Sequence, residues 1–389
     1  MRPKLKLKVS LIQYPTSRIN HPASSIQPPS GMCFHKSFAK SEQDLLDHYQ
    51  ASFDSIRSEL DLMTEKFQTL LARDGRLNEL TPGRPDALFE VLAQYSQKDA
   101  LPVHFTKPEL AEMKYYLKTI SAFHHQGLYR YYENGFDYLP MPILTAGDPN
   151  QFKFFRWGLI PFFMNDPDKA LQLRAQTLNA ISEEMHDKPS YRDALKNGQR
   201  CLIPVTGFFE WRWLDEQGTV KIPYFITFRD QQIRSMAGLY SRWKDPRSGQ
   251  YYYSYTVLTT RANSILEYVH NHKQRMPVFI ARQDEAAWLN RDLPAKDAQE
   301  LCRPSQDAAM RAYTISKLLT TRHINTNVPH VLEPMNYNRA IAEANAFLEK
   351  AEKKKALEAF KQAVAGEKIN VDDLIRAAAQ DIKPELALA

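Results

Sequence analysis

The sequence predicts an α+β protein whose core is an antiparallel, barrel-like β-sheet, accompanied by a helical region and a helical C-terminal tail. From about residue 138 to 280, short apolar runs alternate with turns that contain Pro or Gly, which is the pattern of paired strands. In 41–125, and again after Tyr337, apolar residues instead recur at helical spacing. Runs of strands with a few inserted helices are typical of α+β folds.

The expected strands follow one another closely. They are 140–145, 153–160, 201–205, 208–211, 223–228, 235–240, 251–260 and 276–280. A turn at 215–218 should join the strand that contains Glu210 to 223–228. Thr260 should cap a helix that runs through His270.

The region 41–125 should be mostly helical. Ser41 and Asp44 have the spacing of a capping box, and apolar residues from Leu45 to Leu60 follow at helical spacing. After a Pro-Gly break at 81–85, a second helix should open at Pro108 and end near Phe123. The tail 335–389 is predicted to be helical, and its nine basic and nine acidic residues indicate a solvated face.

The net charge of +6 is concentrated in residues 1–31, which hold five basic residues and no acid. Bulk charge is therefore no sign of DNA binding. We expect this stretch, rich in Pro and Ser, to be a disordered extension that results from a misassigned start, with translation really beginning at Met32. Three cysteines without CxxC spacing predict neither disulfides nor a metal site. No apolar run is long enough for a membrane span, so we expect a soluble, cytoplasmic protein. We also expect it to be a monomer.

Glu210 is the most informative polar residue of the predicted sheet. It shares a strand face with Phe208 in the stretch RCLIPVTGFFEW, so a carboxylate lies among aromatic side chains. Such a group either pairs with a cation, for example Arg212, or has a raised pKa that suits a general acid. The residues alone leave both interpretations open.

Six separated motifs resemble, in order and spacing, those of the SRAP family of SOS response-associated peptidases and abasic-site processing proteins. They are Met32-Cys33, Trp157-Gly158-Leu159-Ile160-Pro161, Leu178-Asn179-Ala180-Ile181-Ser182-Glu183, Lys188-Pro189-Ser190-Tyr191-Arg192, Gly207-Phe208-Phe209-Glu210-Trp211, and Val269-His270-Asn271 with Arg275-Met276-Pro277. The resemblance covers roughly 32–334, which we expect to be the catalytic domain.

The resemblance implies that Cys33, exposed by removal of the initiator Met, crosslinks covalently to abasic sites in single-stranded DNA. It implies that Asn179 positions the reacting groups, that Glu210 is the acid or base, and that His270 assists proton transfer. No cofactor or metal is expected. The candidate DNA contacts are Arg156, Trp157, Arg174, Glu183, Thr260 and Arg275. For Trp157 a place in the core, and for Arg275 a structural salt bridge, remain alternatives.

Three departures from the family pattern are visible. Ile181 stands where the family has Arg, so Arg174 or Arg275 would have to replace a phosphate contact. Phe34-His35 follows the cysteine in place of Gly-Arg. The segment between His270 and Arg275 is long, which leaves His272 as a second candidate for the catalytic histidine.

Two other functions remain open at this point. The first is a cysteine peptidase that uses Cys33, His270 and either Asn179 or Glu210, and that cleaves itself before Cys33. The second is an interaction module without catalytic activity. The residue set of Cys33, Asn179, Glu210 and His270 favours the abasic-site chemistry.

Overall fold

The computed structural model describes residues 34–73, 105–124, 129–218, 220–320 and 326–337. The strands are β1 (His35–Phe38), β2 (Arg130–Asn134), β3 (Pro140–Thr145), β4 (Asp148–Trp157), β5 (Asn179–Ile181), β6 (Arg200–Val205), β7 (Gly207–Trp213), β8 (Lys221–Phe228), β9 (Arg234–Lys244), β10 (Tyr251–Arg261), β11 (Arg275–Pro277), β12 (Phe279–Ile280) and β13 (Met310–Thr314). The α-helices are α1 (Glu42–Tyr49), α2 (Asp54–Leu71), α5 (Lys107–His124), α6 (Pro167–Leu173), α7 (Pro189–Lys196), α8 (Ser264–Val269), α9 (Glu285–Leu289) and α10 (Ala295–Glu300).

Five strands close into a barrel in the order β10, β4, β3, β6, β9, because β9 pairs with both β6 and β10. Most neighbouring strands are antiparallel. The exceptions are β4 and β5, which both run parallel to β10 along one of its edges. The predicted α+β fold with an antiparallel, barrel-like core is confirmed, with these two short parallel pairings in addition.

A second, fully antiparallel sheet has the order β13, β8, β7, β1, β2. The predicted hairpin of β7 and β8 is present, and Glu210 lies opposite Tyr224 in it. β1 pairs with the other edge of β7, with Lys36 opposite Phe208. The first described residues of the chain therefore run antiparallel to the strand that contains Glu210.

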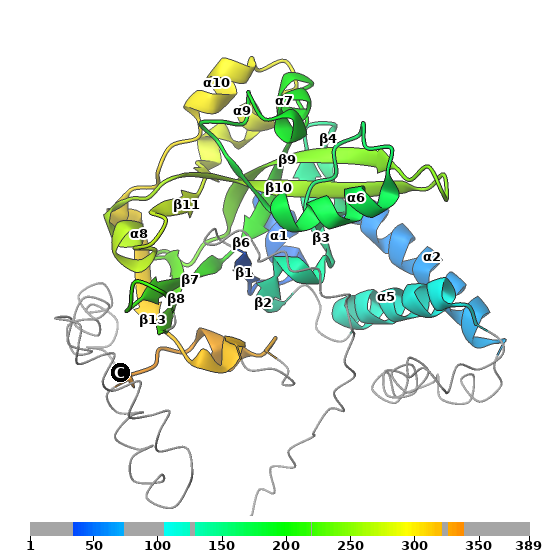
Figure 1. Cartoon of the computed structure of the whole chain (residues 1–389), viewed down its shortest axis with the longest axis horizontal. Coiled ribbons are helices and arrows are strands. Elements are labelled where there is room, and N and C mark those ends of the chain that lie inside the picture. The colour runs from blue at the N-terminus through cyan, green and yellow to red at the C-terminus, as the bar shows by residue number, and fades with distance from the viewer. Residues whose placement is uncertain (1–33, 74–104, 125–128, 219, 321–325, 338–389) are drawn as a thin grey trace, which may run out of the picture.

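The faces of the barrel strands belong to two different hydrophobic clusters, since successive side chains of a strand point to opposite sides. Phe155 packs in a cluster with the second sheet, whereas Phe154 packs in a cluster that includes residues of α1, α2, α7 and α9. The long helices α2 and α5 pack together through a third cluster, and Figure 1 shows them side by side at the edge of the β-rich body. The helix α8 packs on the second sheet, where Leu266 and Val269 join the first cluster.

The first helical region differs from the prediction in one respect. The capping box of Ser41 and Asp44 is confirmed, but the apolar spacing from Leu45 to Leu60 does not form one helix. Gln50 adopts a left-handed conformation (φ 55°), and the backbone of Ser52 then forms two hydrogen bonds with the β4 segment, to Asn150 and Phe152, each 2.8 Å long. These strand-like bonds divide the stretch into α1 and α2. The second helix, α5, confirms its prediction.

The predicted cap at Thr260 is wrong. Thr260 is still part of β10, where it pairs with Met276, and α8 begins only at Ser264 with Asn263 as its N-cap. The Asn263 side chain accepts a hydrogen bond of 3.0 Å from the Leu266 amide. The expected strand 276–280 consists of two short strands, β11 and β12, which pair with β10 and β9 respectively.

The extension 1–31, the break at 81–85 and nearly all of the tail 335–389 lie outside the described residues. Within the described part of the chain, no helix has the length and hydropathy needed to cross a membrane.

Candidate functional site

The site is organised by the pairing of β1 with β7. β7 runs from Phe208 toward Glu210, and β1 runs in the opposite direction, so the chain upstream of Lys36 follows β7 toward Glu210. The first described residue, Phe34, accepts a backbone hydrogen bond of 2.8 Å from Gly135 and packs on Phe136. Cys33 lies outside the described residues.

Glu210 is 4% exposed and lies beside His270, which is 3% exposed. The distance from the His270 Nε2 to the Glu210 Oε2 is 3.8 Å. This distance is longer than a direct hydrogen bond but suits a charged pair, or a pair bridged by one water. The structure therefore brings together two of the predicted catalytic residues.

The orientation of His270 follows from its place at the C-terminal end of α8. Its Nδ1 lies 2.9 Å from the carbonyl oxygen of Arg275, which can only accept, so Nδ1 carries a hydrogen. The Nε2 is then the ring atom that faces Glu210. At 3.8 Å from Oε2 it is beyond direct hydrogen-bond reach, so transfer of a proton between the two groups needs a bridging water or a closer approach.

Of the two candidate histidines, His270 is the one that lies beside Glu210. His272 is exposed, and its ring stacks on Trp213 instead of facing Glu210.

Arg212 donates a hydrogen bond to the carbonyl of Tyr268, and its guanidinium lies 4.0 Å from the Tyr268 ring centroid.

Asn179 is the first residue of β5 and is 4% exposed. It pairs with Val257 of β10, and its carbonyl accepts a hydrogen bond of 3.0 Å from the Tyr191 hydroxyl. Tyr191 comes from α7, in the Lys188 to Arg192 motif, so two of the motifs meet here.

Arg275, Glu183 and Thr260 form one cluster around the end of β10. The Arg275 guanidinium donates two hydrogen bonds to the Glu183 carboxylate, of 3.0 and 2.7 Å, and one of 2.6 Å to the carbonyl of Thr259. Thr260 also approaches Glu183, with 3.4 Å between the hydroxyl and the carboxylate. Partial burial is the largest single effect on the pKa of Glu183 and would raise it, but the hydrogen bonds from Arg275, the positive charge of Arg275 and further hydrogen bonds, including one from Ser182, together lower this pKa. Arg275 therefore already has an anionic partner.

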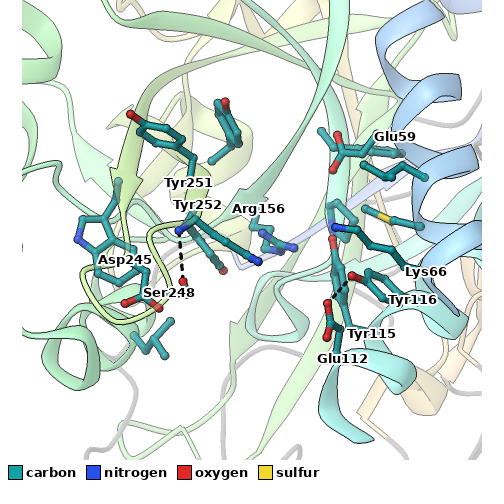
Figure 2. A pocket seen from close by; sticks show the side chains of 18 residues that line it. Glu59, Lys66, Glu112, Tyr115, Tyr116, Arg156, Asp245, Ser248, Tyr251 and Tyr252 are labelled. Carbon is teal, nitrogen blue, oxygen red and sulfur yellow. Dashed lines mark hydrogen bonds between the residues drawn. The ribbon is translucent and has the colours of Figure 1, made fainter. Parts of the chain in front are cut away.

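Arg156 and Arg174 lie elsewhere, in and beside a cleft of about 540 Å³ between α2, α5 and the hairpin of β9 and β10. Figure 2 shows Arg156 between the side chains of the two helices and those of β10. Its guanidinium lies 4.5 and 4.6 Å from the ring centroids of Tyr115 and Tyr252. Arg174 donates a hydrogen bond of 2.8 Å to the Tyr252 hydroxyl.

This cleft lies some distance along β10 from the cluster of Arg275, Glu183 and Thr260. Tyr252 and Thr259 are seven residues apart, or about 23 Å in an extended strand. The cleft is lined by three acidic side chains and two basic ones, Lys66 and Arg156. Its charge does not favour phosphate, so the structure divides the predicted DNA contacts into two groups.

Trp157 occupies the core position that the sequence left open. It is 1% exposed, its indole nitrogen donates a hydrogen bond of 2.6 Å to the Leu178 carbonyl, and its ring stacks on Tyr255. A ring buried in this way offers no face to a nucleobase.

Two features next to the site have no counterpart among the sequence predictions. Lys36 and Glu133 form a fully buried ion pair across β1 and β2, and the Lys36 Nζ lies 5.6 Å from the Trp157 ring centroid. His35 stacks on Tyr132, and burial lowers its pKa to about 3. The pairing of β1 with β2, which are far apart in the sequence, brings Lys36 and Glu133 together, and no local pattern indicates it.

Comparison with known proteins agrees with this architecture. Residues 97–322 match the family described as SOS response associated peptidase (SRAP). The abasic site processing protein YoqW of Bacillus subtilis (strain 168) is 34% identical over 194 residues, which cover 50% of this chain and 81% of that protein. The abasic site processing protein HMCES of Xenopus tropicalis is 32% identical over 191 residues, which cover 44% of this chain and 54% of that protein.

A crystal structure of a Bacteroides thetaiotaomicron protein matches 78% of this chain and all of that chain, with a TM-score of 0.55 and 27% identity. The family match spans more than half of the 389 residues, and YoqW is matched over most of its length. The chain therefore belongs to the SOS response associated peptidase (SRAP) family.

Proposed function

We propose that this protein processes abasic sites in DNA by forming a covalent thiazolidine crosslink between Cys33, at the N-terminus of the active form, and an abasic site in single-stranded DNA. The observation that carries the proposal is the register of β1 on β7. It directs the chain from Lys36 toward Glu210, beside which His270 lies at 3.8 Å. Cys33 is the residue that directly precedes Phe34 in the sequence. The names of the relatives support abasic-site processing.

The chemistry requires a free α-amine on Cys33. The α-amine attacks the aldehyde carbon of the ring-opened sugar, and loss of one water gives an imine. The thiol sulfur then bonds to the imine carbon while the nitrogen gains the proton, which closes a five-membered thiazolidine. An α-amine has an ordinary pKa of about 7.7 to 8.0, so far more of it is neutral at pH 7 than of a lysine.

Glu210 and His270 would serve the proton transfers of this sequence. Opening of the sugar ring needs a proton on the ring oxygen, and loss of water from the carbinolamine needs a second one. A carboxyl that exchanges its proton with a neighbouring imidazole can supply each proton and be restored between steps. Asn179 is proposed to orient the sugar, as the resemblance implies.

Phosphate binding is assigned to the cluster at the end of β10. Arg275 lies five residues from His270, and its contact with Glu183 is partly exposed, so a phosphate can replace or share that contact. Thr260 offers a hydroxyl in the same cluster. We do not assign phosphate binding to Arg156 and Arg174, because they lie in and beside a cleft whose charge does not favour phosphate. We do not assign a DNA contact to Trp157, because it is buried in the core.

The active form must begin at Cys33, because an amide nitrogen cannot form an imine. Translation from Met32 followed by removal of Met, or self-cleavage before Cys33, would each produce it. The second route is the one form of peptidase activity that the proposal accommodates. Full-length protein with Cys33→Ala separates the routes, since only self-cleavage is blocked by this substitution.

The test is a crosslinking assay with protein that begins at Cys33. A single-stranded oligonucleotide with one abasic site should give a band of lower mobility on a denaturing gel. The same oligonucleotide with an intact base, and protein whose α-amine is acetylated while the thiol is free, should give none. Crosslinking that survives acetylation, or that is equal on undamaged DNA, would refute the proposed chemistry.

A further inference from the structure

An aromatic stack lies close to the Glu210 and His270 pair, in a segment that the catalytic chemistry does not use. The imidazole of His272 lies parallel to the indole of Trp213, with ring centroids 3.7 Å apart and an angle of 8° between the planes. Trp213 is the last residue of β7, three positions beyond Glu210, and His272 is two positions beyond His270. The two chain segments that carry the catalytic candidates therefore both continue to the stack.

The stack is held in place from both chain segments. The Asn271 side chain accepts a hydrogen bond of 3.0 Å from the Trp213 amide and donates one of 2.9 Å to the Trp213 carbonyl. On the hairpin side, a Cβ on Gly218 would lie 2.6 Å from the indole, so the turn packs closely against this ring. The loop that carries His272 is therefore fixed on the end of β7.

Two lysines lie near the stack, and the turn that packs on Trp213 also holds the acidic residues Asp215 and Glu216. Lys221 lies with its Nζ 4.4 Å from the centroid of the Trp213 ring, and Lys273 follows His272 in the chain. His272 and Lys273 are both exposed. Partial burial, together with the charges of Lys273 and Lys221 and the neighbouring His270, lowers the pKa of His272, so its ring is neutral at pH 7.

A flat ring supported on one face and exposed to solvent, with lysines beside it, has the properties of a stacking platform for single-stranded nucleic acid. Base stacking on such rings tolerates any sequence, because every base has a π face, and lysines bind the phosphates. The distance from Glu210 to Trp213 along β7 is three residues, or about 10 Å. Because three is an odd number of residues, the side chains of Glu210 and Trp213 lie on opposite faces of β7. A nucleotide next to the lesion would therefore reach the stack by passing the end of β7.

We propose that the exposed face of His272, supported by Trp213, stacks with the nucleobase that flanks the abasic nucleotide, while Lys221 and Lys273 contact the phosphates of that flank. This inference rests on the proposed function, because it takes abasic single-stranded DNA as the ligand. It adds a positioning surface for the intact part of the strand. It assigns a role to the long segment between His270 and Arg275.

The test measures non-covalent binding, so that it is independent of Cys33. Fluorescence anisotropy would give Kd for oligonucleotides that carry a tetrahydrofuran analogue of the abasic nucleotide, which has no aldehyde. Three oligonucleotides are compared. One has both flanking bases, one lacks the base on the 5′ side, and one lacks the base on the 3′ side.

His272→Ala should raise Kd for the first oligonucleotide about 5- to 150-fold, the range expected for loss of one stacked base. On one of the two oligonucleotides with a missing flank, wild type and variant should bind equally, since the stacking partner is gone. His272→Tyr should restore tight binding. His330→Ala, which changes an exposed histidine elsewhere, is the matched control and should bind like wild type.

The lysines have a separate signature. Replacing Lys221 and Lys273 together by Ala should lower the slope of log Kobs against log salt by about 1.4, which corresponds to two phosphates of a single strand. Equal Kd values for wild type and His272→Ala on the first oligonucleotide would overturn the platform. So would a rise in Kd on His272→Ala that is the same for all three oligonucleotides. Absence of binding by wild type would also overturn it. If coupling to one flank is found but no crosslink ever forms, the platform stands and the covalent chemistry fails.

Discussion

The buried pair of Lys36 and Glu133 offers the most quantitative prediction, because it fixes the strand that leads to Cys33. The two residues lie opposite each other on β1 and β2, and their side chains are 0% and 2% exposed. Glu133→Gln leaves the Lys36 ammonium in the core without its counter-charge. Breaking a buried pair in this way costs about 3–5 kcal/mol of unfolding free energy. That is a large part of the stability of an ordinary domain, about 5–15 kcal/mol.

The loss of unfolding free energy on Glu133→Gln should also depend on whether residue 36 carries a charge. Lys36→Met in the Glu133→Gln background should restore part of the lost stability, since no unpaired charge remains. The two substitutions should therefore be strongly non-additive in a double-mutant cycle. Arg247→Met is the control, because Arg247 pairs with Asp168 at 3.1 Å on the surface with side chains 53% and 75% exposed. Such exposed pairs are worth at most about 1 kcal/mol.

Urea denaturation followed by tryptophan fluorescence gives the free energies, and the crosslinking assay gives the functional effect. Glu133→Gln should crosslink more slowly at temperatures where it is still folded, because β1 no longer holds the chain start in register with β7. If Glu133→Gln and Lys36→Met each cost less than the surface control and their effects simply add, the pair does not anchor β1 and this reasoning is wrong.

Four further outcomes are expected. Glu210→Gln should slow crosslinking about 10²- to 10⁴-fold in a gel time course, the usual range for a general acid or base; an unchanged rate would make Glu210 structural. Arg275→Ala should lower the salt slope of DNA binding by about 0.7, one phosphate of a single strand, whereas Glu183→Gln should tighten binding by releasing Arg275; an unchanged slope would remove Arg275 from the interface. His35→Phe should flatten the loss of stability at acid pH. The folded pKa of His35 lies below its unfolded value, so stability falls as pH drops from about 6.5 toward 3, by at most about 1.4 kcal/mol per pH unit. Urea titrations at pH 6.5 and 5 measure how much unfolding free energy each protein loses between these two pH values. An equal loss in wild type and His35→Phe would show that His35 does not cause the pH dependence. His272→Ala should leave the crosslinking rate unchanged at saturating DNA while it weakens binding; a lower saturated rate would place His272 in the chemistry.

The sequence was informative where local pattern decides the structure. Alternation and turn residues located the hairpin that contains Glu210, and the capping box located the start of α1. It failed where backbone pairing overrides local spacing. The apolar series through Leu45 and Leu60 reads as one helix, but hydrogen bonds of Ser52 to the β4 segment interrupt it. Thr260 has the type of a cap, yet β10 continues through it.

For the site, motif spacing located Glu210 and His270 but not their contacts. The pairing of Arg275 with Glu183, and the burial of Trp157, depend on the register of β5, β10 and β11. From the sequence, Arg156 and Arg275 are equivalent candidates for phosphate contacts. The structure shows that they lie at different positions along β10. Lys36 and Glu133 are 97 positions apart and give no local signal.

The central claim is that the α-amine and the thiol of Cys33 both bond to one carbon of the abasic sugar. Mass spectrometry of the purified crosslink, intact and after proteolysis and nuclease digestion, tests it most directly. The account predicts a mass equal to protein plus DNA less one water, a DNA remnant confined to a peptide that begins with Cys33, and no change on treatment with borohydride. A remnant on Lys36 or another lysine, or a gain of two hydrogens after borohydride, would show a simple imine and contradict the account.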